Sequence, residues 1–289
     1  RPIRMIADRF NTLQMGIVCA KRIMDLLDKK EIVSNAGILI PEALTGLVKF
    51  EKVWFAYNKE NWVLKNISFE VKSGKTLALV GATGAGKSSI VNLLNRFYEI
   101  NRGHIYLDDR EIKDYDLSFL RRNIALVLQD VFLFSDSIFN NITLRNPNIS
   151  LEQVYQAANL VGASAFIERL PGGYDYDVME RGATLSVGQR QLISFVRALV
   201  YDPKIIILDE ATSSVDSDTE FLIQKAINIL MKGRTAIVVA HRLSTIQNAD
   251  NIMVLDRGEV KEQGTHENLL SIGGYYSKLH EMQFKEFIL

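Results

Sequence analysis

The spacing of apolar positions changes near residue 46 and predicts two differently built regions. Before residue 30, apolar residues recur at alternating spacings of three and four, which is the period of a helix with one apolar stripe. The stripe consists of Ile3, Ile6, Phe10, Leu13, Ile17, Ala20, Met24 and Leu27. It fits either a helix packed on its own domain or a helix that meets a partner outside this chain. Residues 31–45 have mixed polarity with Gly37 and Pro41, and we expect a linker there.

From residue 46 onward the pattern is typical of strands and turns. Residues 47–57 alternate between apolar and polar, and 62–71 form a second such run, which predicts an antiparallel layer. The run 76–80 indicates a buried strand, and the β-branched runs 204–208 and 235–240 predict parallel strands covered on both faces. Further elements are expected as a strand and turn at 103–109 and helices at about 150–170 and 275–287. These elements predict an α/β fold.

Composition excludes several classes of protein. The chain has 289 residues, 47% hydrophobic and 24% charged, which suits a globular protein with a large core. Lys+Arg and Asp+Glu balance at 34 each, so charge gives no reason to expect nucleic acid or an anionic membrane surface. The single cysteine, Cys19, excludes an internal disulfide and fits a reducing compartment. No apolar stretch reaches the roughly 18 residues that span a bilayer, and no secretory signal is visible. Because the chain begins at Arg1, we expect it to be part of a longer, processed or partly ordered polypeptide.

The segment after the run 76–80 matches the phosphate-binding P-loop pattern G-x-x-x-x-G-K-[ST] in full. Its residues are Gly81, Ala82, Thr83, Gly84, Ala85, Gly86, Lys87 and Ser88. Glycines let successive N–H groups point at one phosphate chain, and the following helix adds the positive end of its dipole. Lys87 is placed to reach the terminal phosphates, and the Ser88 hydroxyl to hold Mg²⁺. The flanking strand and helix favour this interpretation over a plain glycine-rich turn.

Two acids, Asp209 and Glu210, follow the run 204–208. The carboxyl end of a buried parallel strand is where α/β sheets place ligands. Asp209 is suited to holding Mg²⁺ through water, and Glu210 to polarising an attacking water as general base. The alternative is that these two acids lie in a solvated turn. Because the same chain contains a P-loop, a metal and catalytic role is favoured over this alternative.

A second anion-binding feature is expected at the start of a helix near residue 190. The Ser186 hydroxyl, the Gly188 N–H group and the helix dipole together suit an anion. On spacing alone, a capped helix start with Ser186 as N-cap is the favoured interpretation.

Taken together, these residues resemble the nucleotide-binding domain of ATP-binding cassette (ABC) transporters over about residues 46–285. The motifs stand in the family's order: Tyr57, the P-loop, Gln129, the signature sequence 185–189, Asp209-Glu210, Ser214-Val215-Asp216 and His241. Taken singly, four of these residues also have an ordinary structural interpretation. Tyr57 could be a packed strand aromatic and Gln129 a polar surface residue, while Asp216 could cap a helix and His241 could be a turn residue. Their positions relative to the P-loop favour the functional interpretation.

The resemblance implies a fold and a division of the chain. It implies a RecA-like P-loop α/β core with an antiparallel β subdomain and an inserted α-helical subdomain at about 130–196, all within 46–289. Residues 1–30 resemble the cytoplasmic end of a transporter's last transmembrane helix, followed by the linker 31–45.

The resemblance also implies an ATPase with ATP and Mg²⁺ as cofactors. In the family two nucleotide-binding domains, identical or different, dimerise head-to-tail, and each ATP lies between the P-loop of one and the signature of the other. Nucleotide contacts are implied for Tyr57, residues 81–88, Ser89, Ser186, Gly188, Gln189 and Asp216, metal contacts for Ser88, Gln129 and Asp209, and catalytic roles for Lys87, Gln129, Glu210 and His241.

The sequences at 129–138 and 180–182 look like those of ABC exporters, in which the membrane domain is fused N-terminally. This implies a transmembrane-domain partner and a place on the cytoplasmic face of the inner membrane, with no nucleic-acid partner. It also implies a role for Glu180 in communication with the partner's coupling helices. One departure is Val187, where the family signature usually has glycine; a β-branched residue restricts the backbone and puts the strength of dimer closure in question.

Two other functions stay open at this point. One is a soluble ABC ATPase acting on ribosomes or DNA, although such proteins usually carry two cassettes or a long coiled-coil insertion. The other is a binding-only or regulatory cassette of a heterodimer; the presence of Glu210 and His241 argues against it, and Val187 leaves it open.

Overall fold

The computed structural model describes residues 2–28, 33, 35–58, 61–209, 217–239 and 243–284. By its internal contacts the chain divides into a unit 1–34 and a unit 35–289. The first unit contains helix α1 (Pro2–Leu27). From Phe10 to Leu27 the stripe is exposed, Leu13 by 60% and Leu27 by 72%. In the described part of the chain no helix, α1 included, combines the length and the apolarity that crossing a bilayer requires.

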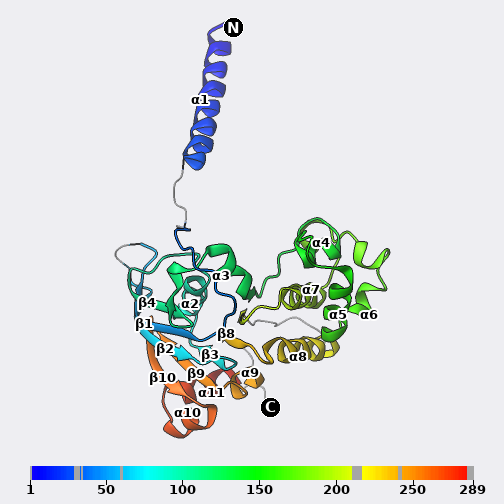
Figure 1. Ribbon diagram of the computed structural model, residues 1–289. Coiled ribbons are helices and arrows are strands. Elements are labelled where there is room, and N and C mark those ends of the chain that lie inside the picture. Colours follow the sequence, from blue (N-terminus) through cyan, green and yellow to red (C-terminus); the bar gives the residue numbers. More distant parts are fainter. Residues whose placement is uncertain are drawn as a thin grey trace. The chain divides into compact units, whose positions relative to one another are not determined.

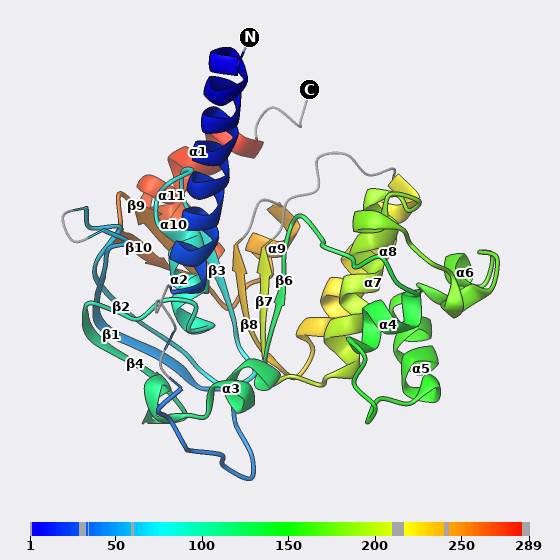
Figure 2. The same ribbon diagram turned by 90° about the horizontal axis from the view of Figure 1, so that it is seen from above.

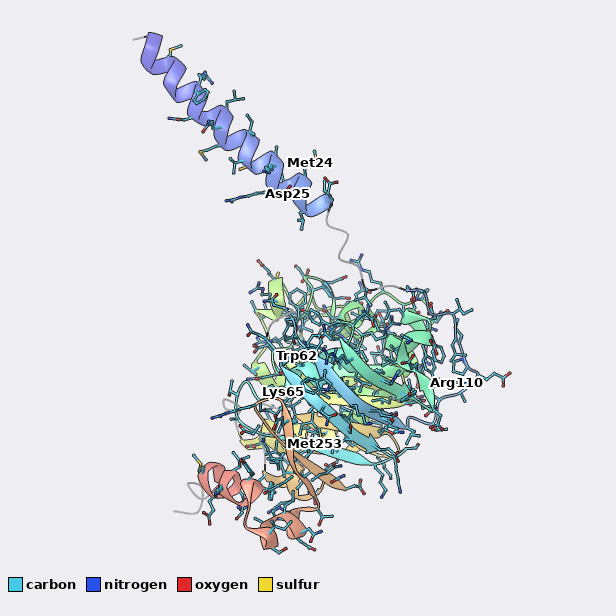
Figure 3. All side chains as sticks on the ribbon, turned by 90° about the vertical axis from the view of Figure 1, so that its left-hand side faces the viewer. Met24, Asp25, Trp62, Lys65, Arg110 and Met253 are labelled. Carbon is cyan, nitrogen blue, oxygen red and sulfur yellow. The ribbon has the colours of Figure 1, made fainter. Side chains whose placement is uncertain are left out.

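The antiparallel layer predicted from alternation is present in the second unit. Its strands are ordered β2-β1-β4-β5, with bounds β1 Val48–Phe55, β2 Leu64–Val71, β4 Arg102–Leu107 and β5 Arg110–Glu111. In Figure 3, Lys65 and Arg110 mark the two edge strands, β2 and β5. Phe50 stacks on Phe69 across β1 and β2 with ring centroids 4.5 Å apart. Two of these strands follow the P-loop in sequence, a pairing that local alternation could not predict.

The second sheet carries the predicted buried runs. Among the described residues its order is β10-β9-β3-β8-β7-β6, and all neighbours except β10 and β9 are parallel. The bounds are β3 Thr76–Val80, β6 Ile124–Val127, β7 Ile205–Asp209, β8 Thr235–Val239, β9 Asn251–Asp256 and β10 Glu259–Gly264. Successive residues of β3 serve opposite faces: Leu77 and Leu79 belong to one apolar cluster, Ala78 and Val80 to the other.

Each face of this sheet has its own cover. One face shares a core with the antiparallel sheet and with α2 (Lys87–Leu94), through side chains such as Ile90 and Leu94. The other face packs against helices that Figure 2 shows grouped beyond the β6 edge. These helices are α4 Ile138–Thr143, α5 Leu151–Val161, α6 Ser164–Ile167, α7 Val187–Val200 and α8 Ser217–Met231, with the short 3-10 turns η2 Gly173–Asp175 and η3 Glu180–Gly182.

The remaining helices are η1 Ile112–Asp114, α3 Leu117–Asn123, α9 Leu243–Gln247, α10 His266–Ile272 and α11 Tyr275–Phe284. Among them, α9, α10 and α11 contribute Ile246, Leu269 and Tyr276 to the apolar cluster on the same face of the sheet as α7. Figure 1 shows α10 and α11 beside β9 and β10. The second unit begins at Asn35, which is earlier than the expected boundary at residue 46, because residues 35–47 are bound to the rest of this unit by backbone and side-chain hydrogen bonds.

Candidate active site

The P-loop joins the end of β3 to the start of α2, and its glycines allow the backbone to pack closely at the base of the loop. Gly81, Gly84 and Gly86 all have positive φ, at 155°, 81° and 107°. A Cβ on Gly81 would lie 2.2 Å from the Leu255 carbonyl oxygen. At Gly84, by contrast, no described atom lies within 4 Å of a Cβ position. The loop is therefore packed at its base and open at its mouth, as close approach of a ligand to the backbone requires.

The Lys87 ammonium group is buried inside this loop. Its Nζ atom donates hydrogen bonds to the carbonyl oxygens of Gly81 (2.5 Å) and Ala82 (3.1 Å), and the residue is 9% exposed. Burial lowers the pKa of Lys87, and the negative charge of Asp209 works in the opposite direction. A buried cation held by neutral carbonyls in an open-mouthed loop is suited to an anionic ligand.

The helix that follows the loop presents two serines in different directions. Gly86 is the N-cap of α2, so the first N–H groups of the helix face the loop. Ser88 is exposed, as are Thr83 and Gly84 of the loop, whereas Ser89 is buried. Ser88 is thus the serine available to a ligand at the mouth of the loop.

Tyr57 is fixed beside the P-loop helix. Its hydroxyl group lies 3.2 Å from the Ser89 hydroxyl and accepts a hydrogen bond from Asn92 Nδ2 at 3.2 Å. Its ring meets the edges of Phe55 and Tyr98 at centroid distances of 4.7 and 4.9 Å. The side chain is still 46% exposed, which leaves ring surface for a stacked base. Asn92 and Tyr98 were not predicted from the sequence, although an aromatic residue soon after the P-loop helix was a usable signal.

Asp209 and Gln129 lie at the same edge of the parallel sheet. Asp209 is the last residue of β7, next to Val239 of β8, and its charge acts on Lys87. Gln129 follows the end of β6, whose Val127 pairs with Leu208, and its side chain is exposed. Because the strands are parallel, their carboxyl ends bring Asp209 and Gln129 to the P-loop edge.

The expected signature sequence, residues 185–189, lies elsewhere in the second unit. Ser186 is the N-cap of α7: its Oγ accepts a hydrogen bond from Gln189 N at 3.2 Å, while Gln189 Oε1 accepts one from Ser186 N at 3.0 Å. Figures 1 and 2 both show α7 among the helices α4 and α5, apart from α2. Val187 is 42% exposed as the first residue of the helix. The structure thus joins Tyr57 to the P-loop helix, sets the charge of Asp209 against Lys87 and places Gln129 at the same edge of the sheet. It does not bring Ser186, Gly188 or Gln189 to them within one chain.

Three expected site residues, Glu210, Asp216 and His241, lie outside the described residues. The described neighbours are the strands β7 and β8, which end at Asp209 and Val239.

A P-loop between a buried strand and a helix, with an acid ending another parallel strand of the same sheet, defines a P-loop nucleotide-binding protein. The model of the ABC transporter family matches residues 64–213. The chain belongs to the ABC transporter family, and within it to the nucleotide-binding domains that bind and hydrolyse ATP. The predicted fold class, a RecA-like α/β core with an antiparallel subdomain and a helical insertion, is confirmed.

Relatives and a solved structure extend the match over nearly the whole chain. The uncharacterized ABC transporter ATP-binding protein YknV of Bacillus subtilis (strain 168) is 47% identical over 288 residues, which are 99% of this chain and 48% of that protein. An ATP-dependent lipid A-core flippase of Haemophilus influenzae (strain 86-028NP) is 46% identical over 286 residues, or 98% of this chain and 49% of the flippase. The structure of a bacterial Atm1-family ABC exporter with ATP bound matches at a TM-score of 0.83 and 38% identity, covering 98% of this chain and 50% of the exporter. The chain spans about half the length of the curated relatives it matches.

Proposed function

We propose that this chain is the ATP-hydrolysing part of an ABC exporter, placed at the cytoplasmic face of the inner membrane, and that it closes head-to-tail around Mg-ATP with a second nucleotide-binding domain. The observation that carries the proposal is the Lys87 ammonium group, buried among loop carbonyls at the edge where Asp209 lies. A polyphosphate is the ligand that matches this cation and the N–H groups of the loop.

Mg²⁺ fits the oxygen donors of the same edge. The Ser88 hydroxyl, the Gln129 amide and the Asp209 carboxylate are hard oxygen ligands, and the first two are exposed. When bound, Mg-ATP supplies the phosphoryl group and a metal charge that offsets the negative charge of the phosphates. Tyr57 would orient the base, and Lys87 the terminal phosphates. Glu210 would take a proton from the attacking water, and His241 would hold that water or Glu210 in place.

The second half of each site would come from another cassette. Ser186, Gly188 and Gln189 begin a fourteen-residue helix, α7, whose N-terminus is suited to an anion. These residues lie apart from the P-loop of their own chain, so a sandwiched nucleotide needs the signature of a partner. Asp216 would organise the partner's site across the interface.

The contact with a membrane domain is supported by a rigid surface next to Gln129. Phe132 and Phe134 are 52% and 54% exposed and meet edge to face with centroids 5.1 Å apart. The loop that presents them is held by Asn141, which donates to the Phe134 carbonyl oxygen at 3.0 Å and accepts from Phe134 N at 2.8 Å. Arg197 of α7 donates to the Asn141 carbonyl oxygen at 2.8 Å. An exposed apolar pair on a fixed loop is suited to a partner helix.

Two further features support the same partner. Glu180 is exposed in η3, between Met179 and Arg181, which both have positive φ. The exposed part of the stripe on α1 suits the cytoplasmic end of a membrane helix packed among others.

A relative from Bacillus subtilis (strain 168), the probable multidrug resistance ABC transporter ATP-binding/permease protein YheH, and the lipid A-core flippase both match at 46% identity. Because relatives named for different cargo match equally well, we assign the choice of cargo to the membrane part.

The test is ATP-dependent dimerisation of the Glu210→Gln variant, measured by light scattering with and without Mg-ATP. We expect a nucleotide-induced dimer that is lost when Ser186→Arg is added, since the added side chain fills the signature site. The P-loop does not include Ser186, so ATP binding to the double variant should persist. A monomer that binds ATP without dimerising would contradict self-association of this chain.

A second candidate is a cassette that pairs with a different one in a heterodimer. The exposed Val187 side chain at the start of α7 favours it, because that surface would face the partner's nucleotide. Dimerisation of the Glu210→Gln variant that appears only after Val187→Gly would support this candidate.

A further inference from the structure

Asp108 binds the chain at the point where it enters the cassette. Its carboxylate accepts four hydrogen bonds: from Thr45 N (2.5 Å), Thr45 Oγ1 (2.6 Å), Gly46 N (3.0 Å) and Leu47 N (2.8 Å). The Asp108 N–H group in turn donates to the Leu47 carbonyl oxygen at 2.9 Å. Asp108 has a φ of 49°, a left-handed conformation that directs its carboxylate back toward residues 45–47. One side chain thus satisfies three successive backbone N–H groups.

The same short stretch holds the chain a second time. Leu39 forms a parallel bridge with Tyr115, donating to the Asp114 carbonyl oxygen (2.9 Å) and accepting from Asp116 N (3.1 Å). Asn35 Oδ1 accepts a hydrogen bond from Leu117 N at 2.8 Å. Residues 108–117 therefore form hydrogen bonds with residues 35–47 at both ends of that segment.

The chain is also tied to the centre of the parallel sheet. Thr235, the first residue of β8, is fully buried and donates its hydroxyl to the Gly46 carbonyl oxygen at 2.7 Å. Its Oγ1 accepts from Gly74 N at 3.1 Å, and Ser73 Oγ donates to the Thr45 carbonyl oxygen. Gly46 has a φ of 90°, and a Cβ there would lie 2.9 Å from Thr235 Oγ1, so the approach requires glycine. The tie is to the amino end of β8, opposite the edge that carries Asp209.

We propose that residues 35–47 are a mechanical clamp, with Asp108 as the positioning residue that closes it, through which load on the α1 segment enters the cassette. The inference rests on the proposed function in one respect, that α1 belongs to a membrane part that moves against the cassette. The clamp delivers load to the amino ends of the central strands. The P-loop lies at their carboxyl ends, so pulling on the chain moves the cassette as one body and leaves the nucleotide site assembled.

Force spectroscopy on the full 289-residue chain tests the clamp. Cys19 is the chain's single cysteine and is exposed on α1, so it offers a specific attachment point, with the other handle at the C-terminus. In the wild type we expect residues 35–47 to detach only together with cassette unfolding. In Asp108→Asn we expect a separate, earlier step of about 45 Å, the length of thirteen extended residues.

The chain offers a matched control. Asp109→Asn makes the same change one residue further along the same turn, where the side chain is exposed, and should behave as the wild type. Asparagine tolerates the left-handed conformation of both positions, so backbone strain is equal in the two variants. At position 108 either orientation of the amide sets its NH₂ group against an N–H donor, because both carboxylate oxygens accept from backbone N–H groups.

Hydrogen exchange gives a second measurement that does not depend on force. In Asp108→Asn the amides of residues 45–47 should exchange at least tenfold faster than in Asp109→Asn, while Mg-ATP affinity stays the same in both. Thr45→Val removes only the hydroxyl donor and serves if Asp108→Asn does not fold; we expect a smaller change in the same direction.

A wild-type chain that releases residues 35–47 in its own early step, or an Asp108→Asn variant that matches Asp109→Asn in both measurements, would overturn the clamp. ATP binding is measured separately on the same samples. Loss of the clamp with intact binding, or the reverse, therefore separates this inference from the proposed ATPase function.

Discussion

The hydroxyl group of Tyr57 lies 3.2 Å from the hydroxyl group of Ser89, across the boundary between the antiparallel subdomain and the P-loop helix. The contact holds the Tyr57 ring beside the phosphate-binding loop. Nearly half of the Tyr57 surface stays exposed. The ring and the loop thus form one surface from elements that are distant in sequence.

Replacement of Tyr57 should separate the ring's two roles. Tyr57→Ala removes a stacking surface of about 1–3 kcal/mol and should weaken ATP binding roughly 5- to 150-fold. Tyr57→Phe keeps the ring and loses only the contacts to Ser89 and Asn92, so we expect a change of less than about fivefold. Titration calorimetry with ATP measures both, and equal effects of the two variants would show that the hydroxyl, not the ring, matters.

Lys87→Met should abolish tight ATP binding without destabilising the free chain. Loss of charge-assisted hydrogen bonds worth about 3 kcal/mol weakens binding roughly 100-fold. Because burial lowers the pKa of Lys87 in the folded state below its ordinary 10.5, folding disfavours the charged form. Wild-type stability should therefore rise with pH toward 10.5 relative to the variant. Calorimetry and thermal unfolding at several pH values check this; a less stable variant at pH 7 would contradict it.

Ser186 should separate helix capping from ligand binding. Ser186→Asp keeps an N-cap acceptor for Gln189 N and should leave thermal stability within about 0.5 kcal/mol, whereas Ser186→Ala should cost about 1 kcal/mol. Toward nucleotide the order reverses, because the added carboxylate repels phosphate. ATP-induced dimerisation of the Glu210→Gln background should be lost with Ser186→Asp and reduced with Ser186→Ala. If both variants dimerise normally, the signature does not contact phosphate.

We expect Asp136 to make the free energy of unfolding depend on pH. Hydrogen bonds from Asn140 and then Arg145 lower its pKa from 3.8 to about 2. A carboxylate with a lowered folded pKa contributes stability that is present above the ordinary value and lost as pH falls through the folded one. Asp136→Asn should therefore be less stable than the wild type at pH 7, and the difference should shrink between about pH 4 and pH 2. Circular dichroism melts across that range measure it, with Asp130→Asn as control. A difference that does not depend on pH would contradict the assigned ionisation.

The P-loop was predictable from sequence because its chemistry is local. Residues 81–88 adopt their shape through their own glycines, between a strand and a helix that periodicity also indicates. The buried runs ending in Asp209 and Val239 were predictable for the same reason, since continuous β-branched residues suit strands covered on both faces. The contact between Asp108 and Thr45 was not predictable, because the two residues are far apart in sequence. A turn aspartate next to another aspartate carries no signal of which residues it will bind.

The sequence by itself determined the class of this protein: a strand, a glycine-rich loop, a helix start and an acid at a strand end are local patterns with local physical causes. Only the tertiary structure decided which strands are neighbours, that the Tyr57 hydroxyl group reaches the P-loop helix, and that residues 35–47 belong to the cassette. Each of these is a contact between distant segments. Such contacts depend on how whole elements bury their apolar faces together, which no short stretch of residues encodes.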